Sequence, residues 1–244
     1  MFLTQKKIEM KKLILLAFLA IGMTANAETV FADNDDDVEK SLIDLGKGAD
    51  KNDRWSMHLQ VGVDVPTNVP DNMSFAPFRS WEIGWTVAQY DYTPKKWKTT
   101  FSAGLGLNWR NYTLKGHKRM FEKVGDVVGV FDADDEYSDL SSSIHTVSLS
   151  IPLLVKQRFA KSFAVSVGAQ LNWNYYARVN NEYEVGDDDC DISTKKIGQR
   201  PFTVDILGII DISDFCIYCK YSPMSVLKNG RGPEFKSLAF GIYF

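Results

Sequence analysis

The stretch 238–244 reads Leu-Ala-Phe-Gly-Ile-Tyr-Phe, and it alternates large apolar residues with small or polar ones. A period of two is typical of a β-strand whose two faces meet different environments. One face carries Leu238, Phe240, Ile242 and the terminal Phe244. The outer wall of a β-barrel in a bilayer meets lipid, so this run favours a membrane barrel. A soluble sandwich that ends on a core strand is the alternative.

Seven other stretches carry a related alternation. They are 55–65, 81–88, 100–110, 146–156, 163–175, 202–211 and 215–221. Most approach the roughly 9–11 residues that a tilted strand needs to cross a bilayer. The stretch 202–211 is ambiguous, because Asp205 shares a face with Leu207 and Ile209. With the C-terminal stretch, the sequence predicts eight strands.

The connections between these strands alternate in length. The short ones are 90–96, 157–162 and 212–214, and the long ones are 66–80, 111–144, 177–200 and 222–234. Short turns on one side and long loops on the other are typical of outer-membrane barrels, whereas a Greek-key sandwich gives no such pattern. We therefore predict an all-β fold, an eight-stranded antiparallel transmembrane β-barrel over residues 54–244, with short periplasmic turns and long extracellular loops.

The first residues resemble an export signal. Lys11 and Lys12 precede the apolar run 13–21, and Ala25-Asn26-Ala27 is a small-residue cleavage site. This order predicts a cleaved signal peptide over 1–27. An acidic periplasmic arm over 28–53 follows, and the predicted location is the outer membrane.

Charge and cysteine content exclude several classes of protein. Without residues 1–27, the chain has 24 Lys and Arg against 30 Asp and Glu, which disfavours nucleic acid as a partner. Cys190, Cys216 and Cys219 form neither a disulfide framework nor a zinc spacing. We predict no metal and no cofactor.

The two faces of the strands differ in a way that indicates which one meets lipid. The polar face is mostly Ser, Thr, Gly, Asn and Gln, which suits a narrow lumen better than the solvated exterior of a soluble barrel. The apolar face carries aromatic residues near the strand ends, as in the interfacial girdles of membrane barrels. The predicted girdle residues are Trp55, Trp81, Trp97, Trp109, Trp173, Tyr175, Tyr221 and Phe244.

The predicted inner face carries charged or titratable residues of both signs. They are His58, Asp64, Glu82, Arg110, Lys156, Asp205 and Lys220. Buried charges are costly unless paired, so we expect a polar network that closes the lumen. Strand direction places Asp205 and Lys156 in the inner half of the barrel along its axis, toward the short turns. It places the other carboxylates and cations in the outer half, toward the long loops.

The chain resembles the porin-like outer-membrane β-barrel family of Bacteroidetes, small barrels similar in shape to the OmpA and OmpX type. The residues that carry this resemblance are the strand 151–156 (Ile-Pro-Leu-Leu-Val-Lys), the strand 202–211, Tyr221-Ser222 and 241–244. The resemblance implies an eight-stranded barrel more firmly than any activity. The family includes a PorT-like branch tied to secretion and gliding machinery, and no residue here singles out that branch.

Three functions remain open on the sequence. The first is a non-enzymatic barrel with a closed lumen, whose loops have a structural or interaction role. The second is a small porin-like channel for small solutes. The third is a lipid-modifying enzyme that uses His145 with Ser143 or Ser148, although no acid is placed by sequence to orient the histidine.

The expected partners follow from the membrane location. They are outer-membrane lipids and lipopolysaccharide, the barrel-assembly machinery through the C-terminal strand, and a surface protein or ligand at the long loops. The basic segment with Lys115, His117, Lys118 and Arg119 is a candidate contact for lipopolysaccharide phosphates, and a solvated loop is the alternative.

Overall fold

The computed structural model describes residues 53–71, 73–94, 97–160, 162–186, 188–213 and 215–244. The predicted signal peptide, and the predicted arm up to residue 52, lie outside the described residues. Within the described ranges, no helix has the length and the apolar character needed to cross a membrane.

The described chain consists of eleven strands and one short 3-10 turn. These elements are β1 (Asp53–Thr67), η2 (Pro77–Arg79), β2 (Trp81–Tyr92), β3 (Thr99–Thr113), β4 (Arg119–Val124), β5 (Val127–Asp132), β6 (Tyr137–Ala160), β7 (Phe163–Val185), β8 (Asp188–Lys195), β9 (Phe202–Ile212), β10 (Phe215–Ser222) and β11 (Lys236–Tyr243).

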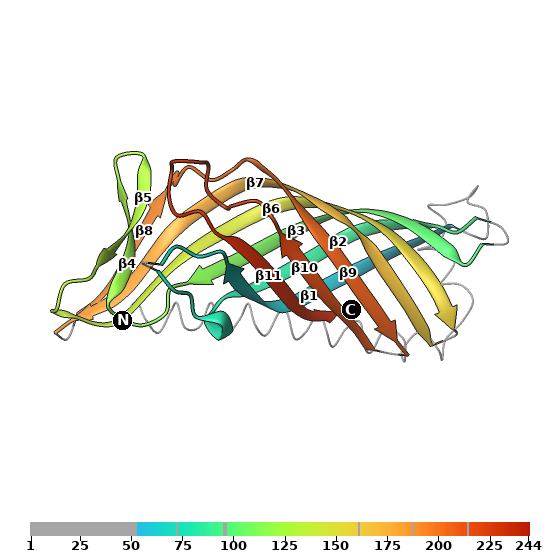
Figure 1. Ribbon diagram of the computed structural model, residues 1–244, viewed down its shortest axis with the longest axis horizontal. Helices are drawn as coiled ribbons and strands as arrows, with labels where there is room; N and C mark the ends of the chain where they lie inside the picture. The colour runs from blue at the N-terminus through green and yellow to red at the C-terminus, as the bar shows by residue number, and fades with distance from the viewer. Residues whose placement is uncertain (1–52, 72, 95–96, 161, 187, 214) are drawn as a thin grey trace, which may run out of the picture. The chain divides into compact units, whose positions relative to one another are not determined.

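Eight of these strands form a closed antiparallel ring (Figure 1). Their order is β1, β2, β3, β6, β7, β9, β10 and β11, and β11 pairs again with β1. Strand β8 pairs with the last third of β7, and β4 and β5 form a separate hairpin. The eight-stranded antiparallel barrel predicted from the alternation is confirmed.

The two ends of the ring differ in their connections. One end, called here the short-turn end, has only the connections 93–98, 161–162 and 213–214. The other, the long-loop end, has the connections that follow β1, β3, β7 and β10. The predicted alternation of short and long connections is therefore present.

Two segments predicted as loops are largely strands, and this part of the expectation is wrong. Strand β6 begins at Tyr137 and β7 ends at Val185, so both continue past the ring at the long-loop end. The ranges 111–144 and 177–200 also contain β4, β5 and β8. These segments are rich in Ser, Asn and acidic residues, so no hydrophobic alternation marked them. The outer parts of β6 and β7 and strand β8 extend an existing ladder, whereas β4 and β5 form a two-stranded sheet of their own. Tyr137 and Tyr183 also stack across the extension of β6 and β7, with ring centroids 4.1 Å apart.

Side chains alternate between a polar, buried inside and an apolar, exposed outside. On the outside, the exposed fraction is 44% for Trp85 and 53% for Ile206. On the inside, Gln60, Asn172 and their polar neighbours are buried. This arrangement is the reverse of a soluble barrel, whose apolar face would point inward.

The inside is not polar throughout, because β9 contributes two large apolar residues to it. Leu207 and Ile209 point inward beside Asp205 and are buried, which resolves the ambiguous alternation of this strand. They belong to the lumen apolar cluster, which consists of Leu154, Leu207, Ile209, Tyr218, Ala239 and Tyr243.

The seam between β11 and β1 depends on two glycines that stand opposite each other. Gly62 pairs with Gly241, and Gly241 pairs with Tyr218 on its other side. A Cβ atom on Gly241 would lie 2.1 Å from the backbone oxygen of Val61, and one on Gly62 would lie 2.2 Å from the Tyr218 hydroxyl oxygen. The glycines therefore give Tyr218 room inside the lumen and let the seam strands approach.

We expect Gly241→Ala to destabilise the barrel by roughly 1–3 kcal/mol, because the new methyl group meets backbone atoms that cannot rotate away. The measurement is urea unfolding of the detergent-folded barrel, followed by heat-modifiable gel migration. The matched control is Gly208→Ala, where the nearest atom to the new Cβ is the Cys219 oxygen at 3.8 Å. Equal loss of stability in both variants would contradict the role assigned to the seam.

Candidate functional site: the lumen and its mouth

Four of the predicted inner-face residues meet across the barrel in one ion cluster. Arg110 on β3 donates from Nε to Glu82 Oε2 at 3.2 Å, and its Nη2 pairs with Asp205 on β9. Lys220 Nζ on β10 lies 2.8 Å from the same Glu82 oxygen. All four side chains are buried, so the lumen ion cluster, defined by these residues, joins strands on opposite sides of the ring.

The fifth charge at this level is Asp64 on β1, which is also fully buried. Its carboxyl group is near enough to Glu82 and Arg110 to interact with both electrostatically. Three carboxyl groups therefore face two cationic side chains at this level of the lumen. This excess of acid would favour cations over anions in any passage through the cluster.

Polar residues that the sequence did not single out complete the cluster. Arg110 Nη1 donates to Ser222 Oγ at 3.2 Å, and Asn172 Nδ2 donates to Asp205 Oδ2 at 2.6 Å. These contacts satisfy groups that would otherwise be costly to bury. No local sequence signal predicts that Ser222 or Asn172 joins this cluster, because only the register of distant strands brings them to it.

The expected depth of Asp205 is wrong. The sequence placed it in the inner half, whereas it lies with Arg110 near the long-loop end. The reason is strand direction: β9 follows a long connection and starts at the long-loop end, so its fourth residue is near the mouth.

The other two predicted inner-face residues lie apart from this cluster. Lys156 Nζ is 2.5 Å from Asp211 Oδ2, near the short-turn end of β6 and β9. The His58 ring stacks on Tyr243 with centroids 4.9 Å apart, and its Nδ1 lies 3.2 Å from the backbone oxygen of Phe244. The seven predicted residues thus lie in two groups, one with five residues near the long-loop end and one with His58 and Lys156, which are near enough to interact electrostatically.

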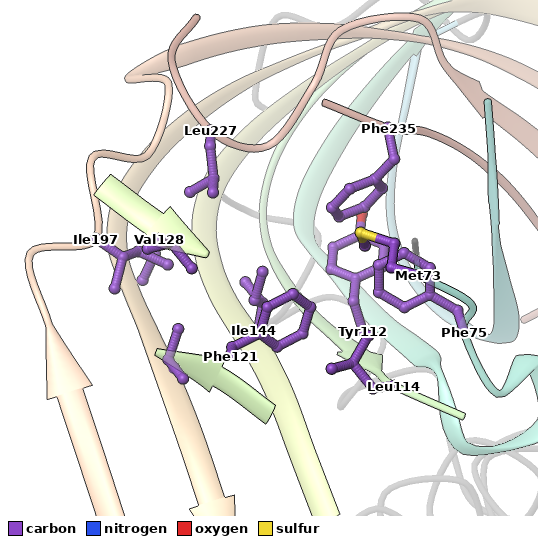
Figure 2. Close-up of a cluster of buried hydrophobic side chains, with 12 residues drawn as sticks. Met73, Phe75, Tyr112, Leu114, Phe121, Val128, Ile144, Ile197, Leu227 and Phe235 are labelled. Atoms are coloured by element: carbon purple, nitrogen blue, oxygen red, sulfur yellow. The ribbon is translucent and has the colours of Figure 1, made fainter. Parts of the chain in front are cut away.

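Buried apolar side chains gather at the mouth of the barrel, at its long-loop end (Figure 2). The mouth cluster consists of Met73, Phe75, Tyr112, Leu114, Phe121, Val128, Ile144, Ala177, Val179, Ile197, Leu227 and Phe235. All four long connections contribute to it, which the sequence analysis missed because single apolar residues in loops show no period. Phe235 packs on Phe75 and Tyr112 with ring centroids 4.8 and 5.2 Å apart.

The β4–β5 hairpin is fixed onto this mouth by contacts to the β10–β11 connection. The backbone nitrogen of Val128 donates to the Arg231 oxygen at 2.9 Å, and Arg231 Nη1 lies 2.6 Å from Asp126 Oδ2. The hydrogen bond and the charge of Arg231 lower the pKa of the Asp126 carboxyl. The pair is exposed, so its contribution to stability is small and is lost as the pH falls through the lowered pKa of Asp126.

Little free space remains between the mouth cluster and the lumen ion cluster. A cavity of about 10 Å³, room for a single water, lies between Arg110, Tyr112, Asp205 and Phe235. Outside it, an open depression of about 470 Å³ is bordered by Arg200, Asn229 and Lys236 among others.

The predicted girdle residues lie mostly on the outside near the two ends of the ring. Trp55 and Trp97 are at the short-turn end, with exposed fractions of 69% and 60%, and Trp97 lies in a turn rather than on a strand. The remaining ones are Trp81, Trp109, Trp173, Tyr175 and Tyr221 toward the long-loop end, and Phe244, which pairs with Leu59 partway along β1.

The candidate catalytic pair lies on the outer face of β6. Ser143 Oγ is 3.1 Å from His145 Nε2, so these two side chains do meet. Ser148 points to the other side of the strand and bonds Asn174. Among the described residues, no group of His, Cys, Asp and Glu is arranged to hold a metal ion, and the three cysteines are free.

The candidate lipopolysaccharide segment at 115–119 is partly engaged within the protein. Arg119 Nε lies 3.3 Å from Asp132 Oδ1, and His117 Nδ1 lies 2.8 Å from the Leu140 oxygen. Lys115 and Lys118 are exposed.

No family model matches this sequence, and no curated protein matches it. Among solved structures, the chain is similar to Ail. The crystal structure of Ail, the attachment invasion locus protein of Yersinia pestis, aligns with a TM-score of 0.35 and 10% sequence identity. The alignment covers 80% of this chain and 100% of the Ail chain. Ail in complex with the heparin analogue sucrose octasulfate gives 10% identity and a TM-score of 0.30, over 78% and 97% of the two chains. The assignment of the barrel rests on strand pairing, not on this distant likeness.

We expect Arg110→Met to destabilise the barrel by about 3–5 kcal/mol, because Asp205 loses its cation and Glu82 loses one of two. The matched control is Lys156→Met, which breaks a partly exposed pair and is expected to cost less than about 1 kcal/mol. Chemical unfolding of both variants in the same detergent measures the difference. Similar losses would show that the lumen ion cluster has no special role in stability.

Proposed function

We propose that this protein is an integral outer-membrane barrel with a closed lumen, non-enzymatic, whose role resides in the packed structure at its long-loop end. The observation that carries the membrane placement is the exposed apolar exterior of the ring. On β7 the band runs from Phe163 to Tyr175, about 40 Å along the strand and about 30 Å in height at a tilt of about 40°. That height is comparable to the hydrocarbon core of a bilayer.

We also propose that the protein is related to the porin-like barrels of Bacteroidetes that its sequence resembles. The strand 151–156 that carries the resemblance lies in β6, with Ile151 and Leu153 exposed and Leu154 inside. Export through a cleaved signal peptide, the long-loop end facing outward, and assembly through the C-terminal strand complete the proposed placement.

We expect the mature polypeptide to fold only in detergent or lipid and to show heat-modifiable gel migration in the outer-membrane fraction. In vesicles, a variant that retains only Trp85 should be quenched most by lipids brominated deep in the acyl chains, because Trp85 lies on the outside midway along β2. A variant that retains only Trp55 is the control, quenched most by shallow bromines. A monomeric, folded protein in plain buffer would refute the membrane placement.

The closed lumen is supported by three successive layers of side chains. The mouth cluster comes first, the lumen ion cluster lies beneath it, and the lumen apolar cluster follows toward the short-turn end. Tyr112 lies between the first two, since its ring packs on Phe235 in the mouth cluster and it lines the small cavity together with Arg110 and Asp205. The interior of an eight-stranded barrel is just wide enough for its side chains to fill, which leaves no room for a solvent channel.

We expect no steady conductance when the protein is added to planar bilayers, with a large porin as the positive control. A variant that lacks residues 117–134, and with them the β4–β5 hairpin, should also stay silent, because the lumen ion cluster remains below the opened mouth. Steady conductance of the wild type would favour the small-channel alternative. Conductance of the hairpin variant alone would make the mouth cluster the only barrier.

An interaction role is supported by the exposed side of the β4–β5 hairpin. Val124, Val127 and Phe131 are 59%, 45% and 43% exposed, although the hairpin is fixed at its other side. Exposed apolar residues on a rigid support are typical of a surface that binds a partner. Deletion of the hairpin that removes a surface phenotype while heat-modifiable migration persists would support this role.

The lipid-modifying alternative rests on the contact between Ser143 and His145. We propose that this pair is not catalytic, since the residue directly opposite His145 in the sheet is the cation Arg178, whose charge disfavours the imidazolium that a general base must form. His145→Ala should leave the mass of lipid A unchanged in cells that overproduce the protein. A mass change that depends on His145 would restore the enzymatic alternative.

A further inference from the structure

Three basic residues that are distant in the sequence stand in one row across the sheet at the long-loop end. His145 on β6 pairs with Arg178 on β7, and Arg178 pairs with Lys195 on β8. Directly paired residues of an antiparallel sheet project from the same face. The neighbouring row on this face contains Val147 and Tyr176, so the three bases lie on the outside of the barrel wall. We call them the basic row.

The two permanent cations of the row, Arg178 and Lys195, form no ion pair with the described part of the chain. Among the described residues, no carboxylate lies within 4.0 Å of a cationic nitrogen of Arg178 or Lys195. Like charges placed directly opposite each other are destabilising in a sheet. The Lys195 ammonium instead leans over the ring of Tyr176, 6.0 Å from its centroid.

A fourth base extends the row on the β3 side. Arg79 is the last residue of η2, and its backbone oxygen accepts a hydrogen bond from Nδ2 of Asn111, the residue paired with His145. Its guanidinium donates to Ser141 Oγ at 2.8 Å and has no carboxylate within 4.0 Å in the described part of the chain. Arg79 is exposed.

The height of the row indicates which anion it meets. Arg178 lies two residues beyond Tyr176, the last aromatic before it on the outer face of β7, which is roughly 7 Å along the strand. The first acids on this face, Glu182 and Asp191, pair with each other four residues beyond Arg178. From the apolar band outward, the wall therefore shows aromatic, basic and then acidic side chains. Lipid phosphate groups lie just outside the hydrocarbon boundary.

We propose that the basic row binds the phosphate groups of a phosphorylated glycolipid of the lipid A type in the outer leaflet. Arg178 supplies a planar guanidinium suited to a phosphate, with Lys195 and Arg79 as flanking charges. Acyl chains of the same lipid lie along Trp173 and Tyr176. This inference rests on the proposed membrane placement, and it assigns the lipid contact to the barrel wall instead of the segment 115–119.

The test compares lipid retention by the wild type and by Arg178→Gln/Lys195→Gln, each folded in detergent and analysed by native mass spectrometry. The probes are bisphosphorylated lipid A, the same lipid dephosphorylated, and inorganic phosphate. We expect the double variant to bind bisphosphorylated lipid A about tenfold more weakly or worse, since each charged hydrogen bond contributes well over a factor of ten. Dephosphorylated lipid should bind the wild type about as weakly as the variant binds lipid A.

The matched control is Lys115→Gln/Lys118→Gln, which removes the same charge from exposed residues outside the row and should retain lipid A. If folding of the double variant fails, Lys195→Gln alone serves, because β8 lies outside the ring. Equal weakening in the control, equal binding of dephosphorylated lipid, or inorganic phosphate displacing lipid A at equimolar amounts would overturn the proposal. If the double variant shows normal heat-modifiable migration and binds lipid A as the wild type does, the role of the basic row is refuted and the membrane placement stands. If the wild type itself shows no heat-modifiable migration, the membrane placement is refuted.

Discussion

Closure of the sheet between β1 and β11 is the constraint from which the other features follow. Once Val61 pairs with Ile242 and Gly62 with Gly241, the ring has no free edge, and its backbone polar groups bond within the wall. Each side chain then has only two environments, the narrow inside and the exposed outside. A charge placed inside cannot reach bulk water, so it must find a partner across the lumen. The lumen ion cluster is the consequence, since Arg110 meets carboxylates from β2 and β9 at once.

This constraint also explains why the sequence predicts the ring well and its interior only in part. The contrast between an apolar outside and a mostly polar inside repeats along each ring strand, so alternation identifies the strands. The alternation of short and long connections indicates in which direction each strand runs. The interior contacts depend on register between residues such as Arg110 and Asp205, which are 95 positions apart. No local pattern encodes that distance. The depth of Asp205 was misplaced for a simpler reason, the direction assigned to β9.

The long connections could not be predicted from alternation, because their structure does not arise from a two-sided wall. Phe75, Phe121 and Phe235 belong to short apolar or mixed stretches without a sustained period of two, and they become one cluster only when the long connections converge on the mouth. Similarly, the outer parts of β6 and β7 contain Ser142 and Asn181, whose side chains bond each other at 2.6 Å. Polar strands of this kind are held by hydrogen bonds and by continuation of a ladder, neither of which leaves a hydrophobic period in the sequence.

Register has one further effect: it brings positions scattered in the sequence together on one patch of the wall. His145, Arg178 and Lys195 are separated by 33 and 17 residues, yet the pairing of β6, β7 and β8 sets them side by side. Charge runs along the sequence, such as the segment 115–119, are therefore a poor guide to the charge that a lipid meets. A lipid headgroup contacts the side chains that lie beside it on the wall, whatever their separation in the sequence. The pairing of neighbouring strands, and not the charge of a single loop, therefore decides which cations it meets.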